Sequence, residues 1–210
     1  MPHLNVWLVR HGQSANNAGQ PTWGNAEVPL TELGIEQSRA VAARIDRQPA
    51  LIVVSPFLRS RSTAEWILAR WPQAPFETWP IQEFTYLSLA RCLGSTVSTR
   101  QALVDAYWQR CDPAFVDGPE AESFSQFMER VYAFHQRLLS RDGDFVVAVG
   151  HGQFFSAYLF ALAHGFSVTP EWMKSYRAAE CAKPITNGEI IALGESPKLP
   201  HSDIFALAIS

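Results

Sequence analysis

Two histidines and two arginines occupy comparable places in this 210-residue sequence, each just beyond a short apolar run. Arg10 and His11 follow the first run directly. Arg59 comes shortly after the second run, and His151 follows the third with one glycine between. A guanidinium group can bind two phosphoryl oxygens at once through two parallel N–H groups, and an imidazole can attack phosphorus as a nucleophile. If the fold gathers these four side chains, they form a site for an anion such as a phosphoryl group.

The three apolar runs are predicted to be strands in the centre of a sheet. Residues 6–9, 51–54 and 145–149 are almost continuously apolar, as expected of strands that are covered on both faces. Because helical sequence separates them, the predicted fold is α/β, a three-layer sandwich with a mostly parallel central sheet flanked by helices. Ligands of such sheets bind at the carboxyl ends of the strands, where the four side chains lie.

Capping residues and apolar spacing predict the helices. Thr31 is a suitable N-cap, and Ser123 with Gln126 forms a capping box ahead of an apolar stripe of helical period. We expect one helix from Thr31 to about Ile45 and another after Ser123. A third is expected from about Ser98, with Leu103, Tyr107 and Cys111 on one side, and a fourth after His151, through Phe154, Tyr158 and Leu162. Two further strands are expected at 189–193 and 203–208, as a hairpin at one edge of the sheet.

Composition limits the class of protein. With 47% hydrophobic and 18% charged residues, the chain can bury a core large enough to need neither disulfides nor a structural metal. The three cysteines form no CxxC pair, and the net charge of -3 attracts neither nucleic acid nor an anionic membrane. No signal-peptide pattern or run of about 20 apolar residues is present. We therefore expect a cytoplasmic protein without metal or other cofactor, and we leave a homo-oligomer open.

Five short motifs resemble those of the histidine phosphatase superfamily, which includes the cofactor-dependent phosphoglycerate mutases. The most specific is Arg10-His11-Gly12-Gln13-Ser14 with Asn17 beyond it, which resembles the RHG signature, although Gln13 stands where a Glu is common. The matches follow the order of the family from residue 6 to about 155. The other matching segments are Pro29–Gly34 (PLTxxG), Ser55–Ser60 with Thr63 and Ala64 (SPxxRxxxTA), the acidic Glu83, and Gly150-His151-Gly152, with a further echo at Ala121–Phe124.

The resemblance implies a metal-independent reaction with a covalent intermediate. His11 would attack phosphorus and become a phosphohistidine, which divides one difficult hydrolysis into two easier steps. Arg10, Arg59 and His151 would bind the phosphoryl oxygens and stabilise the charge that develops on them. His151 is expected to be protonated beside the phosphate.

A carboxylate must exchange the proton with the leaving oxygen and then with water. The resemblance places Glu83 in this role, with a pKa raised by apolar neighbours, and Glu77 is the fallback. Asn17, Gly152 and Gln153 are further candidates for binding phosphate or substrate. Asn and Gln near turns also commonly cap loops, so Asn17 and Gln153 could have this structural role instead of binding substrate.

Substrate selection is expected outside these motifs. The resemblance implies one domain over residues 1–210 with a cap-like insertion at about 84–120, which includes Tyr86, Arg91 and the helix around Tyr107. Aromatic walls around the pocket are expected from Trp23, Trp108 and Trp172.

The predicted function is a phosphomonoesterase that hydrolyses a small phosphorylated metabolite. One alternative is phosphoryl transfer of the phosphoglycerate mutase type, but mutases of the family tend to have a longer insertion and tail that exclude water. The other alternative is a catalytically silent relative that binds a phosphorylated ligand. The presence of all five expected catalytic groups argues against that alternative.

Overall fold

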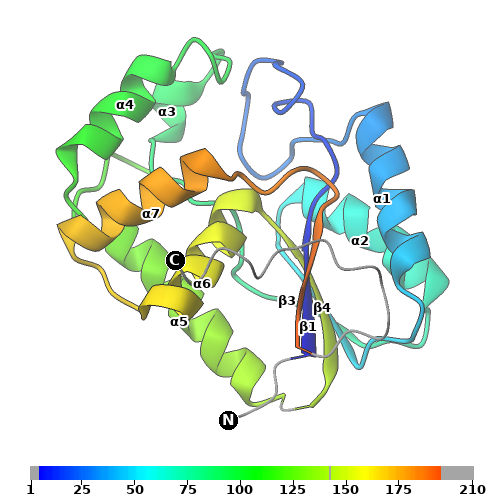
Figure 1. The fold of residues 1–210 in the computed structure, drawn as a ribbon. Helices are drawn as coiled ribbons and strands as arrows, with labels where there is room; N and C mark the ends of the chain where they lie inside the picture. The colour runs from blue at the N-terminus through cyan, green and yellow to red at the C-terminus, as the bar shows by residue number, and fades with distance from the viewer. Residues whose placement is uncertain (1–4, 142, 195–210) are drawn as a thin grey trace.

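A computed structural model of the chain describes residues 5–141 and 143–194 and is a three-layer sandwich (Figure 1). Its five-stranded sheet has the order β3-β2-β4-β1-β5. The first four strands run parallel, and β5 pairs antiparallel with β1 at one edge, so the predicted, mostly parallel sheet is confirmed. The strands are β1 (Asn5–Arg10), β2 (Leu51–Val54), β3 (Phe76–Thr78), β4 (Phe145–Gly150) and β5 (Ile190–Leu193).

Helices cover both faces of the sheet. In Figure 1, α1 and α2 lie on one side of it and α5 and α6 on the other, with α7 packed against α6. The two remaining helices, α3 and α4, lie together at the end of the molecule beyond the sheet. The helices are α1 (Glu32–Arg44), α2 (Leu58–Arg70), α3 (Leu89–Cys92), α4 (Gln101–Arg110), α5 (Phe124–Leu139), α6 (Gly152–His164) and α7 (Pro170–Ala182).

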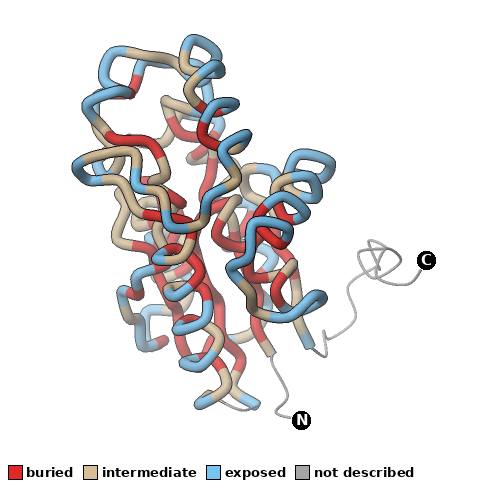
Figure 2. The backbone as a smooth tube through the Cα atoms, turned by 90° about the vertical axis from the view of Figure 1, so that its left-hand side faces the viewer, coloured by how far each residue is buried: buried red, intermediate tan, exposed pale blue. Residues whose placement is uncertain are grey.

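The core lies on both sides of the sheet because successive strand residues point to opposite faces. Val6 and Leu8 belong to the larger apolar cluster, whereas Trp7 and Val9 belong to the smaller one. Figure 2 shows buried residues running through the middle of the molecule while the outer faces of the helices are exposed. Burial of each such side chain contributes about 1.5–3 kcal/mol, and this holds the strand ends in place.

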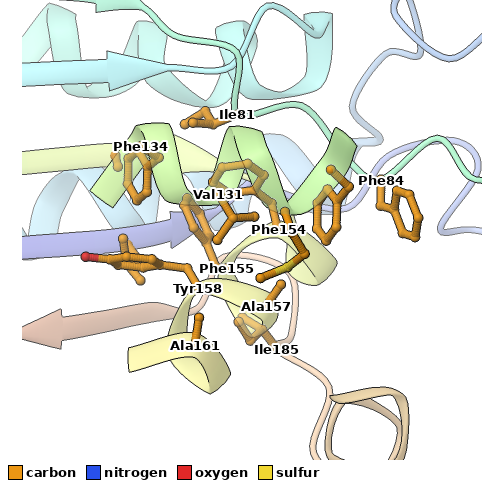
Figure 3. Packing of buried hydrophobic residues seen from close by; sticks show 14 of the residues in the cluster. Ile81, Phe84, Val131, Phe134, Phe154, Phe155, Ala157, Tyr158, Ala161 and Ile185 are labelled. Atoms are coloured by element: carbon orange, nitrogen blue, oxygen red, sulfur yellow. The ribbon is translucent and has the colours of Figure 1, made fainter. Parts of the chain in front are cut away.

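The larger cluster fixes the place of α6, which begins at the predicted site. Phe134 on α5 packs edge-on against Phe154 and Tyr158 on α6, with ring centroids 5.5 and 5.0 Å apart (Figure 3). The predicted N-cap at Thr31 and the capping box at Ser123 are both present. The apolar stripe that follows Ser123 is buried as expected.

Several predicted boundaries are wrong. The helix expected from Ser98 begins at Gln101, and Cys111 lies beyond its end in a left-handed conformation with a φ of 51°. In α6 the inward side chain is Ala161, whereas Leu162 is 39% exposed. A helix turns about 100° per residue, which places residue 161 near the Phe154 direction and residue 162 well away from it.

No range was predicted for four elements, namely α2, β3, α3 and α7. The strand β3 has only three residues and α3 only four, which is too short for a periodic signal. The strand predicted at 189–193 corresponds to β5, and the one predicted at 203–208 lies outside the described residues. None of the helices in the described part of the chain is long and apolar enough to cross a membrane.

Candidate active site

The pairing of β1 with β4 brings the two histidines together. Arg10 and Gly150, the last residues of these parallel strands, are in register. The backbone N–H of His11 donates to the carbonyl of Gly150 at 3.0 Å. His11 and His151 therefore leave the sheet side by side, with ring centroids 5.0 Å apart.

Arg59 reaches the same place from the next strand. The strand β2 lies beside β4, and α2 starts three residues after β2 ends, so Arg59 falls in its first turn. The Nε of Arg59 donates to Nε2 of His11 at 3.1 Å, and its Nη1 donates to the carbonyl of Asn25 at 2.8 Å. Arg61 lies outside the site and pairs with Glu27 at 3.3 Å on the surface.

The hydrogen bonds of His11 define its protonation state. Its Nδ1 lies 2.7 Å from the carbonyl oxygen of Gly12, which can only accept, so Nδ1 carries the proton. Its Nε2 accepts from Arg59 and therefore carries the lone pair. Burial, followed by the charge of Arg59, holds the pKa of His11 well below its usual value. The imidazole is thus neutral, with its nucleophilic nitrogen at Nε2.

His151 is fully buried and is oriented by two serines. Its Nε2 lies 2.7 Å from Oγ of Ser55 and 3.2 Å from Oγ of Ser60. Burial and the charge of Arg59 hold the pKa of His151 well below its usual value, so the ring is neutral in the protein alone. The expected protonation of His151 thus does not apply to the protein without an anion. When the serines donate to Nε2, Nδ1 carries a hydrogen and is a neutral donor.

Two buried nitrogens at this site have no hydrogen-bond partner among residues 5–141 and 143–194. They are Nε of Arg10 and Nδ1 of His151. Arg10 is held by its Nη1, which donates to the carbonyl of Ile185. Gly152 lies against this guanidinium, since a Cβ at that position would come within 3.3 Å of Nε of Arg10. Buried donors without partners are rare in folded proteins, so these two nitrogens are available to bind an anion.

Glu83 lies at the N-terminus of α6. Its carboxylate accepts from the backbone N–H groups of Gln153 at 3.4 Å and Phe154 at 3.3 Å. Burial raises the pKa of Glu83, while the charges of Arg10 and Arg59 act in the opposite direction. A carboxyl group with a raised pKa can hold a proton near neutral pH and donate it.

The fallback carboxylate, Glu77, lies elsewhere. It is on β3, where it accepts from Nε1 of Trp79 at 2.7 Å and pairs with Arg137 at 3.1 Å and Arg141 at 2.8 Å. Its pKa is lowered, first by the bond from Trp79, and it does not line the cavity. Glu77 is therefore a surface charge.

A cavity of about 360 Å³ is lined by Arg10, His11, Arg59 and Glu83, whereas His151 and Gly152 do not line it. This volume is in the range of sites for small molecules. The side chains around it come from the strand ends, from the segment 84–120 and from α7. The predicted site residues that line it are Arg10, His11, Asn17, Arg59, Glu83 and Gln153.

Glycines and a threonine hold the loop that carries His11. A Cβ on Gly12 would lie 2.2 Å from the carbonyl oxygen of Gly34, so a side chain at Gly12 is excluded. The backbone N–H of Gly12 donates to Oγ1 of Thr63 at 3.0 Å, and the N–H of Thr31 donates to the carbonyl of Gln13 at 2.9 Å. The Pro29–Gly34 motif therefore supports the loop rather than the chemistry.

Asn187, which sequence reasoning missed, supports the same loop. Its Nδ2 donates to the carbonyl of His11 at 3.0 Å and to Oδ1 of Asn17 at 3.1 Å. The same Oδ1 accepts from Oγ of Ser14 at 3.0 Å, so Asn17 caps the loop as well as lining the cavity. The only local signal was the turn-forming Asn-Gly pair at 187–188, which says nothing about His11.

The prediction that Trp23, Trp108 and Trp172 form aromatic walls of the pocket is wrong. Trp23 is 76% exposed, and Trp108 and Trp172 pack in the larger apolar cluster, with no part in lining the cavity. Phe57, Phe84 and Tyr86 line it instead. Sequence reasoning also missed the charged side chains on the cavity wall that come from outside the motifs, namely Arg100, Arg177 and Glu180.

Across 5–141 and 143–194, no group of three or more His, Cys, Asp or Glu side chains is placed to hold a metal ion. The three cysteines are free thiols, and Cys92 is the buried one.

The sequence matches the model of a known protein family. The family model of the histidine phosphatase superfamily (branch 1) matches residues 6–183. The chain belongs to the histidine phosphatase superfamily.

Individual relatives match either a short part of the chain or the whole fold at low sequence identity. "Probable phosphoglycerate mutase GpmB" of Photorhabdus laumondii is 45% identical over 65 residues, which is 30% of this chain and 30% of that protein. The alpha-ribazole phosphatase of Shigella flexneri is 23% identical, covers 91% of this chain and 94% of its own, and has a TM-score of 0.67. A mycobacterial glucosyl-3-phosphoglycerate phosphatase in complex with VO3 is 24% identical, covers 89% and 88%, and has a TM-score of 0.67. These two structures share the fold.

Proposed function

We propose that this protein is a phosphomonoesterase that hydrolyses a small phosphorylated metabolite through a phosphohistidine on His11, without a metal. The observation that carries the proposal is the neutral His11, with its lone pair at Nε2, next to two buried donors that lack a partner among the described residues. Phosphoryl oxygens would complete the hydrogen bonds of Arg10 and His151. Membership of the superfamily supports this chemistry.

The first step transfers the phosphoryl group to the enzyme. Nε2 of His11 forms a bond to phosphorus while the bond from phosphorus to the leaving oxygen breaks, and Glu83 gives that oxygen its proton. Because Nε of Arg59 occupies the lone pair of Nε2, its hydrogen bond must move to a phosphoryl oxygen when substrate binds. The carbonyl of Gly12 stabilises the positive charge that the ring acquires.

The second step releases phosphate. The carboxylate of Glu83, now ionised, takes a proton from water while the water oxygen bonds to phosphorus and the P–N bond breaks. Both the His11 lone pair and the Glu83 proton are restored. Arg10, Arg59 and His151 stabilise the charge of the phosphoryl oxygens in both steps.

The test is to trap the intermediate. With a 32P-labelled phosphomonoester, wild type should form an acid-labile phosphoenzyme, and His11→Ala should form none. Addition of a metal chelator should leave the rate of phosphate release unchanged. An acid-stable adduct, or a phosphoenzyme in His11→Ala, contradicts the proposal.

Mutase chemistry is a second candidate because curated relatives that match part of the chain are named as phosphoglycerate mutases. A mutase shares the first step but returns the phosphoryl group to a second ligand. Stimulation of phosphoglycerate isomerisation by a bisphosphoglycerate primer, in excess of phosphate release, would favour the mutase. Phosphate release alone favours hydrolysis.

A further inference from the structure

Charged side chains from outside the motifs line one part of the cavity. Arg100 comes from the residue that precedes α4, and Arg177 and Glu180 come from α7. Tyr86 lines the same part of the cavity, and burial raises the pKa of its hydroxyl to about 12. We call these four residues the cap side of the cavity.

If the proposed function is correct, the charged side chains that line the cavity and the bound phosphoryl dianion sum to one unbalanced positive charge. The two phosphate-site arginines balance a phosphoryl dianion, and Glu83 is neutral while it holds the proton for the leaving oxygen. Arg177 pairs with Glu180 at 2.5 Å, so these two charges cancel. Arg100 has no ion-pair partner anywhere in the described ranges, and its positive charge remains.

Most N–H donors of the Arg100 guanidinium make no hydrogen bond within the described residues. A guanidinium carries five N–H donors, and the hydrogen bond that Arg100 makes within the described chain is from Nη1 to Oγ1 of Thr22 at 2.7 Å. The side chain is partly buried, where an unpaired charge is more costly than in water. An anion in the cavity would relieve that cost and accept from the free edge of the fork.

We propose that the substrate carries a carboxylate on its leaving group, and that Arg100 on the cap side binds it. The proposal rests on the proposed function and narrows the substrate class to phosphorylated hydroxy acids. Val97 and Val104 line the cavity beside Arg100 and suit a short carbon chain. The Tyr86 hydroxyl and the Arg177–Glu180 pair offer donors and acceptors to hydroxyl groups on that chain.

The test uses pairs of phosphomonoesters of equal carbon number that differ in the carboxylate. The pairs are phosphoglycolate with ethyl phosphate, 3-phosphoglycerate with glycerol 3-phosphate, and 6-phosphogluconate with sorbitol 6-phosphate. The readout is the ratio of kcat/KM within each pair. Wild type should prefer the acid by about 10- to 100-fold in at least one pair, as expected for one charge-assisted contact. In Arg100→Met the ratio should fall to near one, and Arg100→Gln serves if Arg100→Met does not fold.

Thr22→Val is the matched control. It removes the hydrogen bond that ties Arg100 to the loop but keeps the guanidinium, and the backbone bonds of Thr22 to Gly94 and Ser95 are retained. If Arg100 binds substrate, Thr22→Val keeps the preference for the acid. If Arg100 only joins the loop to the cap, Thr22→Val loses the preference as fully as Arg100→Met does, and the proposal is wrong.

Binding separates this proposal from the proposed function. Calorimetric titration of His11→Ala with the same pairs measures recognition without turnover, and the acid should bind more tightly only while Arg100 is present. Absence of phosphate release from every ester in wild type would reject the proposed function, yet a binding preference lost in His11→Ala/Arg100→Met would still support the carboxylate site. Equal binding and equal turnover within all three pairs would reject that site.

Discussion

Replacement of Glu83 by Gln isolates the proton that the proposed first step requires. The amide keeps one oxygen, which can still accept from the N–H of Phe154 at the start of α6, and of these hydrogen bonds only the long one from Gln153 at 3.4 Å is lost. What is lost is the acidic proton, which burial favours by raising the pKa of Glu83. General acid catalysis contributes about 10²- to 10⁴-fold, so Glu83→Gln should lower kcat/KM for an alkyl phosphate by that factor.

The effect should depend on the leaving group. The p-nitrophenolate ion leaves without protonation, so phosphorylation of His11 by p-nitrophenyl phosphate should fall less than about tenfold in Glu83→Gln. Dephosphorylation also needs Glu83 as a base, so the phosphoenzyme should accumulate. Stopped-flow assays should therefore show a burst of p-nitrophenol equal to the enzyme concentration, followed by a slow phase.

Glu77→Gln is the matched control because Glu77 does not line the cavity, and its amide oxygen can still accept from Nε1 of Trp79 when the two arginine pairs are lost. It should change kcat/KM less than twofold and the free energy of unfolding by less than about 1 kcal/mol. Equal losses on alkyl and p-nitrophenyl phosphate in Glu83→Gln, without a burst, would refute the assignment of Glu83 as acid and base.

Three further outcomes follow from the site. Gly12→Ala should lower the free energy of unfolding by about 1–3 kcal/mol, measured in urea, because its Cβ would overlap the Gly34 carbonyl; unchanged stability would contradict this. Because the pKa of His11 is well below its usual value, phosphoenzyme formation should show no acid limb near pH 6.5 other than the second ionisation of the substrate phosphate at about pH 6, and an additional limb there would show an ordinary histidine. The raised pKa of Glu83 means that the folded state binds its proton more tightly than the unfolded state, so stability should decline as pH rises from about 4.3 through that pKa, and this decline should be absent from Glu83→Gln.

Local patterns in the sequence predicted much of the framework. Continuous apolar runs identified β1, β2 and β4, and side chains that can cap a helix located the starts of α1 and α5. These features depend on neighbours in the chain, so a single sequence can reveal them. Of the elements that it missed, β3 and α3 are too short to carry a period, whereas α2 and α7 have 13 residues each.

The convergence of Arg10, His11, Arg59 and His151 could also be predicted, because strand ends of a parallel sheet meet at one edge. Their roles in catalysis stay predictions. The sequence alone did not determine that His11 and His151 are neutral. Protonation depends on burial and on the distance to Arg59, and both are produced by residues far apart in the chain.

Only the tertiary structure decided which side chains surround the cavity. Asn187 reaches the carbonyl of His11 across more than half of the chain, and Arg100 reaches the cavity from a segment without a recognisable motif. Contacts of this kind arise when packed layers bring distant loops to the same sheet edge, and no local pattern encodes that distance. The sequence therefore determined the chemistry that is available, and the fold determined where each group acts.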